Sequence, residues 1–311
     1  MTLASGLGLN RLDLGPRFSL VSYLPTATAA LIVVLVLAAG APGTHPTWSR
    51  ALQQARAIDV ADVALLAVMV TLLAVLLQPL QLRLVRLLEG YWGGGPVVGT
   101  LSSLPMALQR RRRDALAKRA TVELKTGVPP GPPPASAVAA QEALNARFPS
   151  AALLLPTALG NALRAFEERA GRAYGLDAVV IWPRLYPVLP DPVRAGVDDR
   201  RDQLDVSARI SASAFVVALI TAALLWGDGW WLLLPLGALA VSRAGYSAAV
   251  SAAVAYGQGV RVAIDLHRFD LLQSLHLPLP TDREAEREAN QALCDFLRQG
   301  VPIPLKYEHP E

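Results

Sequence analysis

Residues 206–260 read VSARISASAFVVALITAALLWGDGWWLLLPLGALAVSRAGYSAAVSAAVAYGQGV. Apart from Arg209, only Asp228 and Arg243 carry charge in this stretch. A helix needs about twenty predominantly apolar residues to cross the roughly 30 Å hydrocarbon core of a bilayer. The stretch therefore predicts two membrane-crossing helices, residues 208–227 and 230–256, joined by a short turn.

Aromatic residues gather at this turn. The indole ring is most favoured at the level of the lipid headgroups, so a turn rich in tryptophan between two apolar helices fits the membrane surface. A second aromatic pair lies in the proline-broken apolar segment 176–190, which is too short to span. We expect that segment at the cytoplasmic membrane surface or packed under the helices. The predicted interfacial anchors are Trp182, Tyr186, Trp226, Trp230 and Trp231.

The composition agrees with a membrane protein. Of 311 residues, 53% are hydrophobic and 17% are charged, whereas about a quarter of the residues of a soluble domain are charged. The net charge of +4 is modest. Its uneven distribution along the chain indicates that the basic residues set the orientation of the protein in the membrane, and does not indicate binding of nucleic acid. Cys294 is the only cysteine, so neither an intramolecular disulfide nor a zinc site built on cysteines is available.

Two further apolar stretches precede the hairpin, at residues 22–42 and 63–82. The first is either a transmembrane helix or the apolar part of a cleaved signal peptide. Its length and its long leading segment favour the membrane helix. The predicted fold class is therefore an all-α integral membrane protein with four transmembrane helices and amphipathic cytoplasmic helices.

Lysine and arginine near the ends of spans set the orientation, because short cytoplasmic loops are enriched in both. Basic residues follow the second span, precede the third and follow the fourth, and the tryptophan turn has none. We expect both termini in the cytoplasm of a bacterial cell, with the protein in the inner membrane. Residues 44–62 and the tryptophan turn would face outside. The basic residues used are Arg83, Arg86, the run Arg110–Arg113, Arg209, Arg261 and Arg268.

The chain is expected to have four segments: a first helix pair (1–100), a cytoplasmic helical insert (101–205), the second hairpin (206–260) and a cytoplasmic helical tail (261–311). A proline-rich linker, 127–134, divides the insert, because consecutive prolines donate to neither helix nor sheet. Within the insert we expect a short helix at 115–123 and an amphipathic helix at 156–175.

Helix-boundary signals refine the second half of the chain. Asp191 before a proline predicts the start of a helix that continues into the third span. In the tail, Thr281 and Glu284 have the spacing of a capping box, which predicts a helix ending at Gly300.

The fourth predicted span carries the residues that could have a role in a pore or in packing. Placing an arginine such as Arg243 near the middle of a membrane helix raises the free energy of insertion by about 2.5 to 3.5 kcal/mol. We therefore expect the side chain either to face a water-filled cavity or a partner, or to bend toward the cytoplasmic interface. Small residues at four-residue intervals permit close helix contact, within the bundle or between copies of the chain. The candidate pore or packing residues are Ser242, Arg243, Gly245, Ser247, Ser251 and Gly257.

No motif predicts catalysis. The chain has no phosphate-binding glycine loop, no nucleophile elbow and no HExxH sequence, so we expect no enzyme, cofactor or metal. Carboxylates alternate with arginines along residues 198–209, a pattern typical of a solvated helix. A divalent-cation site is the alternative for Asp198, Asp199, Asp202 and Asp205.

Two stretches resemble multi-pass membrane proteins of high-GC bacteria of the actinobacterial type. These are LPTALGN at 155–161 running on to YGLDAVVIWP at 174–183, and DLHRFDL at 265–271 with LPLP at 277–280. The resemblance implies a membrane protein and no particular activity. By layout alone, four helices with a cytoplasmic insert and tail, the chain is also similar to the bestrophin channels.

Two functions follow as hypotheses. The first is a non-enzymatic membrane scaffold or sensor that binds a cytoplasmic protein through its cytoplasmic helices. The alternative is a homo-oligomeric channel for anions, or a small-solute pore, lined by the fourth span. The expected partners are the lipid bilayer, further copies of the chain and a cytoplasmic protein, with no nucleic acid.

Overall fold

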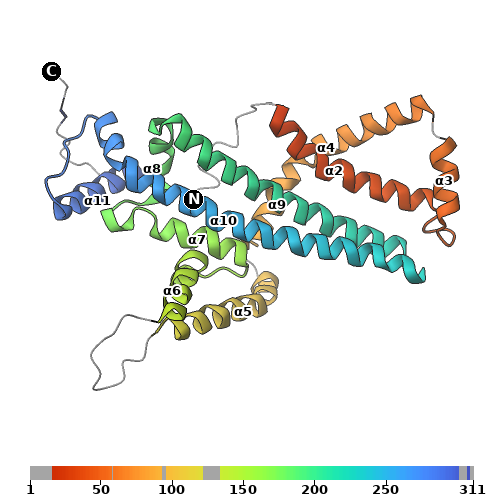
Figure 1. The fold of residues 1–311 in the computed structure, drawn as a ribbon, viewed down its shortest axis with the longest axis horizontal. Helices are drawn as coiled ribbons and strands as arrows, with labels where there is room; N and C mark the ends of the chain where they lie inside the picture. Colours follow the sequence, from red (N-terminus) through yellow and green to blue (C-terminus); the bar gives the residue numbers. More distant parts are fainter. Residues whose placement is uncertain (1–15, 58, 93–95, 122–133, 301–306, 309–311) are drawn as a thin grey trace. The chain divides into compact units, whose positions relative to one another are not determined.

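The computed structural model describes residues 16–57, 59–92, 96–121, 134–300 and 307–308. These residues form helices and turns, with no strand among them (Figure 1), so the predicted all-α class is confirmed for this part of the chain. The α-helices are α2 (Pro16–Ala38), α3 (Trp48–Ala57), α4 (Val60–Glu89), α5 (Pro96–Ala120), α6 (Ala135–Arg147), α7 (Ala158–Arg169), α8 (Ala178–Leu185), α9 (Asp191–Leu224), α10 (Leu233–Ser274) and α11 (Arg283–Gln299). The linker 127–134 lies outside the described residues, apart from Pro134 at the N-cap of α6.

The chain divides into two compact units. We call Leu12–Leu88 with Gln203–Ala249 the hairpin unit, and Glu89–Asp202 with Val250–Glu311 the insert unit. Helices α9 and α10 each run through both units without a break. The insert unit thus begins before residue 101 and takes its share of α10 from residue 250, earlier than the segment boundaries expected from sequence.

Two helices of the described chain are long and apolar enough to cross a membrane, Asp191–Leu224 and Gly229–Ser274. Four spans were expected, so that prediction is met only in part. The first predicted span, residues 22–42, falls largely in α2, of which Ala27–Ala38 is an apolar stretch. The other predicted span lies in α4, where several side chains are outside the described residues.

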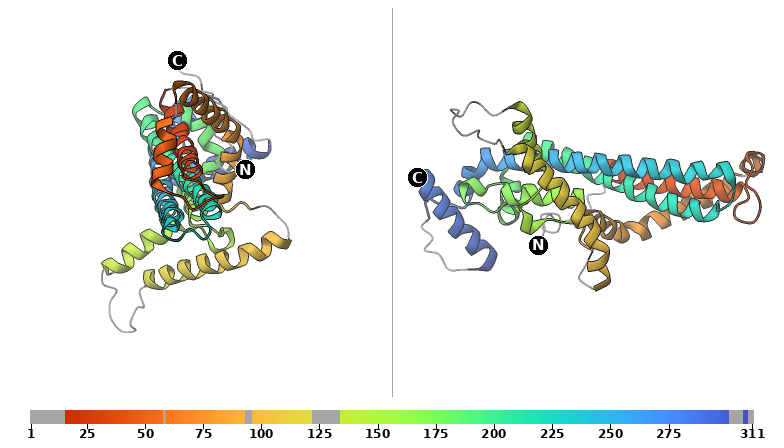
Figure 2. Two further views of the ribbon diagram at one scale, coloured as in Figure 1. Left: turned by 90° about the vertical axis from the view of Figure 1, so that its right-hand side faces the viewer. Right: turned by 90° about the horizontal axis from the view of Figure 1, so that it is seen from below.

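In the hairpin unit, α9 and α10 run side by side, as the views of Figures 1 and 2 show. The turn that joins them contains the short helical stretch Gly229–Leu232. The end of α2 packs against this turn through a small buried cluster of Val36, Ala41 and Leu225. Only small parts of the two apolar windows are buried, 28% in α9 and 11% in α10. The helices therefore present most of their apolar surface outward.

The insert unit has its core around α8. Ile181, Trp182 and Leu185 on one face of this short helix are almost fully buried, together with Val260 and Ile264 of α10. Helix α7 packs against the same core, where the rings of Phe166 and Tyr256 meet edge to face with centroids 5.6 Å apart. The apolar residues of these helices recur every three or four positions, which places them on the helix face that is turned toward the core.

Several helix boundaries differ from those expected. Helix α5 covers 25 residues, where only a short helix at 115–123 was expected. The amphipathic helix α7 ends at Arg169 and is followed by Gly171 in a left-handed conformation. Asp282, and not Thr281, caps α11 by accepting hydrogen bonds from the Glu284 and Ala285 amides. The predicted start at Asp191 and the predicted end at Gly300 agree with α9 and α11.

Candidate functional site

Two serines tie α9 to α10 in the hairpin unit. The Ser211 hydroxyl donates to the Ser242 carbonyl at 3.0 Å, and the Ser242 hydroxyl donates to the Ser211 carbonyl at 2.9 Å. Both side chains are buried, and each carbonyl also serves its own helix. A reciprocal pair of this kind fixes the rotation and the axial register of one helix against the other.

A glycine permits this contact. A Cβ added at Gly245 would lie 3.0 Å from the Ser211 amide nitrogen and 3.3 Å from the Ser207 carbonyl oxygen. The two backbones therefore approach so closely that a larger residue would separate them. We call Ser211, Ser242 and Gly245, with Ser207, the serine–glycine contact.

Gly257 lies in a similar contact in the insert unit, where an added Cβ would meet the Phe166 side chain at 2.7 Å. Ser242, Gly245 and Gly257 thus lie at helix–helix contacts. All three are among the six candidate residues for which the sequence allowed either pore lining or packing.

The other three candidates lie on a different face of α10. Arg243, Ser247 and Ser251 are exposed and follow each other at intervals of four residues, so they share one side of the helix. Arg243 makes no ion pair with any of the residues that the structure describes. Ser242, one position before Arg243, points instead into the serine–glycine contact, so the candidate residues are divided between two faces of α10.

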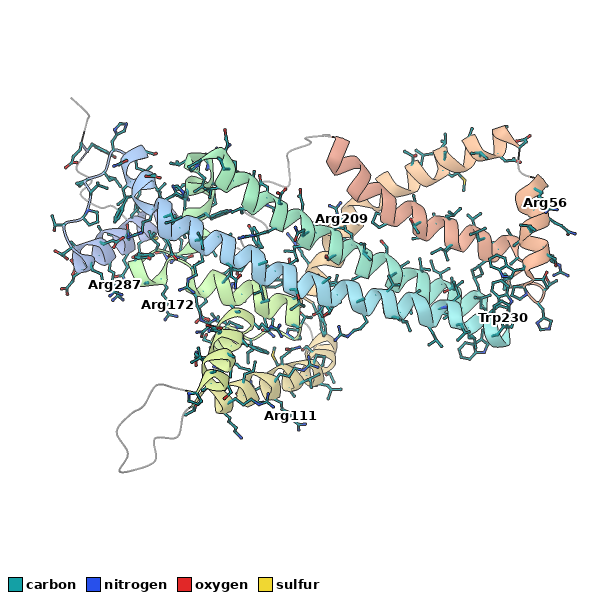
Figure 3. All side chains as sticks on the ribbon, viewed as in Figure 1. Arg56, Arg111, Arg172, Arg209, Trp230 and Arg287 are labelled. Carbon is teal, nitrogen blue, oxygen red and sulfur yellow. The ribbon has the colours of Figure 1, made fainter. Side chains whose placement is uncertain are left out.

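The turn between α9 and α10 carries the expected tryptophans. Trp226 is 86% exposed and Trp230 is 63% exposed, and Figure 3 shows Trp230 at the tip of the hairpin unit. Trp231 contacts Trp48 of α3 with ring centroids 5.8 Å apart, and the His45 imidazole is hydrogen-bonded to Asp228 at 3.0 Å. The segment 44–62 and the tryptophan turn therefore lie at the same end of this unit.

No family model, curated protein or solved structure matches this chain. The resemblance to multi-pass membrane proteins and the likeness in layout to bestrophins therefore stay predictions.

The second aromatic pair, in the insert unit, has a different environment. Trp182 is only 1% exposed, whereas an indole that anchors at the headgroups must be accessible to lipid. Helix α8 directs the ring into the core of the insert unit, which favours the second of the two expected placements, packing under the helices, for this residue. The Trp182 Nε1 donor has no partner within the described residues.

Tyr186 is half-buried and donates its hydroxyl proton to the Asp198 carboxylate, with oxygen distances of 2.7 and 2.8 Å. Burial, followed by the hydrogen bond and negative charge of Asp198, raises the pKa of Tyr186 to about 12. The Arg194 guanidinium lies 5.7 Å from the centre of the same ring. These contacts hold the start of α9 against the end of α8.

The metal alternative at residues 198–205 finds no support in geometry. Across the described ranges, no three histidine, cysteine or carboxylate side chains come together closely enough to hold a metal ion. Asp198 is engaged by Tyr186, and Asp199 is exposed.

Sequence reasoning missed the contact that docks α11 on α10. The Arg268 guanidinium donates to the Glu286 carboxylate at 2.7 Å, and both side chains are largely buried. The same guanidinium lies over the Tyr174 ring at 4.1 Å and over the Phe269 ring at 4.3 Å. Arginine and glutamate here are eighteen residues apart on different helices, so no local spacing could have indicated the pair.

Cys294 completes the docking of α11. Its thiol is buried, and its sulfur accepts a hydrogen bond from the Asp177 amide at 3.4 Å. Burial raises the pKa of Cys294, so the thiol stays protonated at neutral pH and is a poor nucleophile.

Proposed function

We propose that the protein is a non-enzymatic, multi-pass membrane scaffold or sensor of the bacterial inner membrane. In this proposal the hairpin unit lies in the bilayer and the cytoplasmic helices of the insert unit bind a protein partner. One observation carries the membrane assignment. The large apolar side chains of the hairpin point outward, while small and polar ones lie between its helices.

The exposed side chains are large and numerous. On α9 and α10 they include Phe215, Leu219, Leu233, Leu236 and Leu239, each more than 40% exposed. A soluble protein rarely exposes a continuous apolar patch larger than a few hundred Å², and its core helices are mostly buried. An outward apolar surface over a contact of small residues is the arrangement expected of helices that meet in lipid.

Charge supports the orientation in this proposal. The tryptophan turn, with its exposed indoles, carries no lysine or arginine, and the arginines that follow the hairpin belong to the insert unit. By the excess of basic residues in cytoplasmic loops, the insert unit lies in the cytoplasm. Four spans then put both termini on that side, with α2 and α4 supplying the first two.

A test of this proposal starts with membranes from cells that express the full chain. Integral proteins stay in the pellet at alkaline pH, whereas peripheral ones are released. We expect the protein to remain in the pellet and to dissolve only in detergent. Release by alkali would overturn the membrane assignment.

One observation favours the channel alternative. Counted from Leu233, Arg243 lies about 15 Å along α10, close to the middle of a bilayer, and its side chain is exposed together with Ser247 and Ser251. A guanidinium facing lipid at that depth is costly. Pairing this face with other copies of the chain around a water-filled path would remove that cost.

Ion flux separates the two functions. The wild type, Arg243→Gln and the matched control Arg283→Gln, which removes an exposed charge from α11, are reconstituted in liposomes. A channel predicts chloride or potassium flux that Arg243→Gln abolishes or makes differently selective, while Arg283→Gln leaves it unchanged. A scaffold predicts no flux from folded protein in any of the three.

A further inference from the structure

A groove in the insert unit opens between α6, α7 and α10, with a volume of about 630 Å³. Ala139, Ala143 and Ala146 form its wall on α6, at spacings of four and three residues that put them on one helix face. Phe166 of α7 and Val254 of α10 complete an apolar floor. The volume falls in the range of small-molecule sites.

The rim of this groove is basic. Arg147, Arg169 and Arg261 line it, and Glu142 is the one acidic side chain in the lining. Arg147 and Arg261 are exposed. Among the described residues, Arg261 forms an ion pair only with Asp265, at 4.0 Å on its own helix. Both exposed guanidinium groups can therefore donate to a ligand.

Arg169 fixes the geometry of the rim. Its guanidinium donates to the Asn145 carbonyl at 2.7 Å and to the Phe148 carbonyl at 2.8 Å, which joins the end of α6 to α7. Burial lowers the pKa of Arg169, and the nearby charges of Arg113, Arg172 and Arg261 act in the same direction, while Glu168 opposes them. Positive charge is therefore concentrated at this end of the groove.

The groove begins where the membrane span of α10 ends. Twenty residues of helix from Leu233 cover about 30 Å and reach Ala252. Val254 follows within one turn, and Arg261 lies about 14 Å beyond Ala252. In the sequence of α10, Val254 and Arg261 therefore come just after the twenty residues that a span from Leu233 would use.

We propose that the groove holds an anionic phospholipid of the cytoplasmic leaflet, with the phosphate against Arg147 and Arg261 and the glycerol region along the alanine wall of α6. Basic pockets beside membrane helices on the cytoplasmic side are suited to such headgroups. A guanidinium pair matches the geometry of phosphate oxygens. This proposal rests on the membrane location proposed above.

Native mass spectrometry of the full chain in mild detergent tests it, with phosphatidylglycerol and phosphatidylcholine of the same acyl length as probes. We expect one phosphatidylglycerol to be retained in preference to phosphatidylcholine. Arg147→Gln with Arg261→Gln should weaken this binding by roughly fivefold for each arginine removed. Arg283→Gln with Arg287→Gln removes the same charge from the exposed face of α11 and should change nothing.

Ala143→Phe fills the groove without altering charge and should also abolish the preference, with circular dichroism as the check on folding. Equal retention of the two lipids, equal loss in both arginine pairs, or full displacement by inorganic phosphate at matched concentration would overturn the groove proposal. Alkaline extraction of the same membranes reports separately on the membrane location. If the protein resists extraction but shows no lipid preference, lipid binding in the groove is contradicted and the membrane location is not.

Discussion

At the scale of single residues, the hydrogen bond between Tyr186 and Asp198 is the contact whose protonation can be followed. The phenol hydroxyl donates a hydrogen bond, and the Asp198 carboxylate accepts it. Ionising the phenol would set two negative charges side by side, so the folded state favours the neutral form.

We expect Tyr186 to ionise at a higher pH than is usual for a tyrosine. Its pKa rises from 10.0 to about 12; the stabilisation is therefore complete below pH 10 and is lost as the pH rises through about 12. The phenolate absorbance of the wild type minus that of Tyr186→Phe measures this titration. A difference titration centred near pH 10 would contradict the proposed contact.

Tyr186→Phe should also lower the free energy of unfolding by about 1 to 2 kcal/mol, because the hydrogen bond goes to a charged acceptor. Chemical denaturation in detergent measures the change. Tyr307→Phe is the control, since Tyr307 is 58% exposed and should leave the unfolding free energy unaltered.

At the scale of helices, the serine–glycine contact explains why α9 and α10 pair as they do. Gly237 and Gly245 lie on the same helix, but a Cβ at Gly237 meets nothing within 4 Å. Substitutions at the two glycines can therefore be compared directly, because Gly245 lies in a helix–helix contact and Gly237 does not.

Gly245→Leu should destabilise the hairpin by about 1 to 3 kcal/mol, because the side chain must push α9 away and strain the serine pair. Gly237→Leu should cost far less. Unfolding by SDS, followed by circular dichroism, gives both values. Equal values for the two variants would show that the close backbone approach does not hold the helices together.

The sequence predicted some helices well because their signals are local. Apolar runs and the Asp191-Pro192 start predicted α9, and Gly300 predicted the end of α11. Only residues 115–123 of helix α5 were expected to be helical; the helix itself continues through Pro105, a residue that is usually disfavoured inside a helix. The Arg268–Glu286 pair and the burial of Trp182 depend on contacts between distant segments, which one sequence does not reveal.

At the scale of the whole molecule, the proposed membrane orientation rests on charge and on the tryptophan turn. The Cys294→Ala variant has no cysteine, so a single cysteine can be introduced into it at a chosen position. Ser49 beside the turn and Ser274 at the end of α10 are both exposed.

In intact cells, an impermeant maleimide should label Ser49→Cys and spare Ser274→Cys until the membrane is opened. The reason is the excess of arginine on the side of Ser274. The reverse pattern would invert the topology. Labelling of both residues in intact cells would be incompatible with a helix α10 that crosses the bilayer.

The candidate residues on α10 show how far sequence reasoning reaches. Six small or polar residues were singled out together, since helical periodicity cannot say which side of a helix meets a neighbour. The structure sorts them by burial, with Ser242, Gly245 and Gly257 at contacts and Arg243, Ser247 and Ser251 outside. That sorting needed the position of α9 and α7, which the sequence of α10 does not contain.

Helix α10 is unbroken over its 42 residues, Leu233–Ser274. It contains both Gly245 of the serine–glycine contact and Arg261 of the groove rim. Between these two residues the chain has no loop, so any substitution that interrupts it there must break the backbone hydrogen bonds of a single helix.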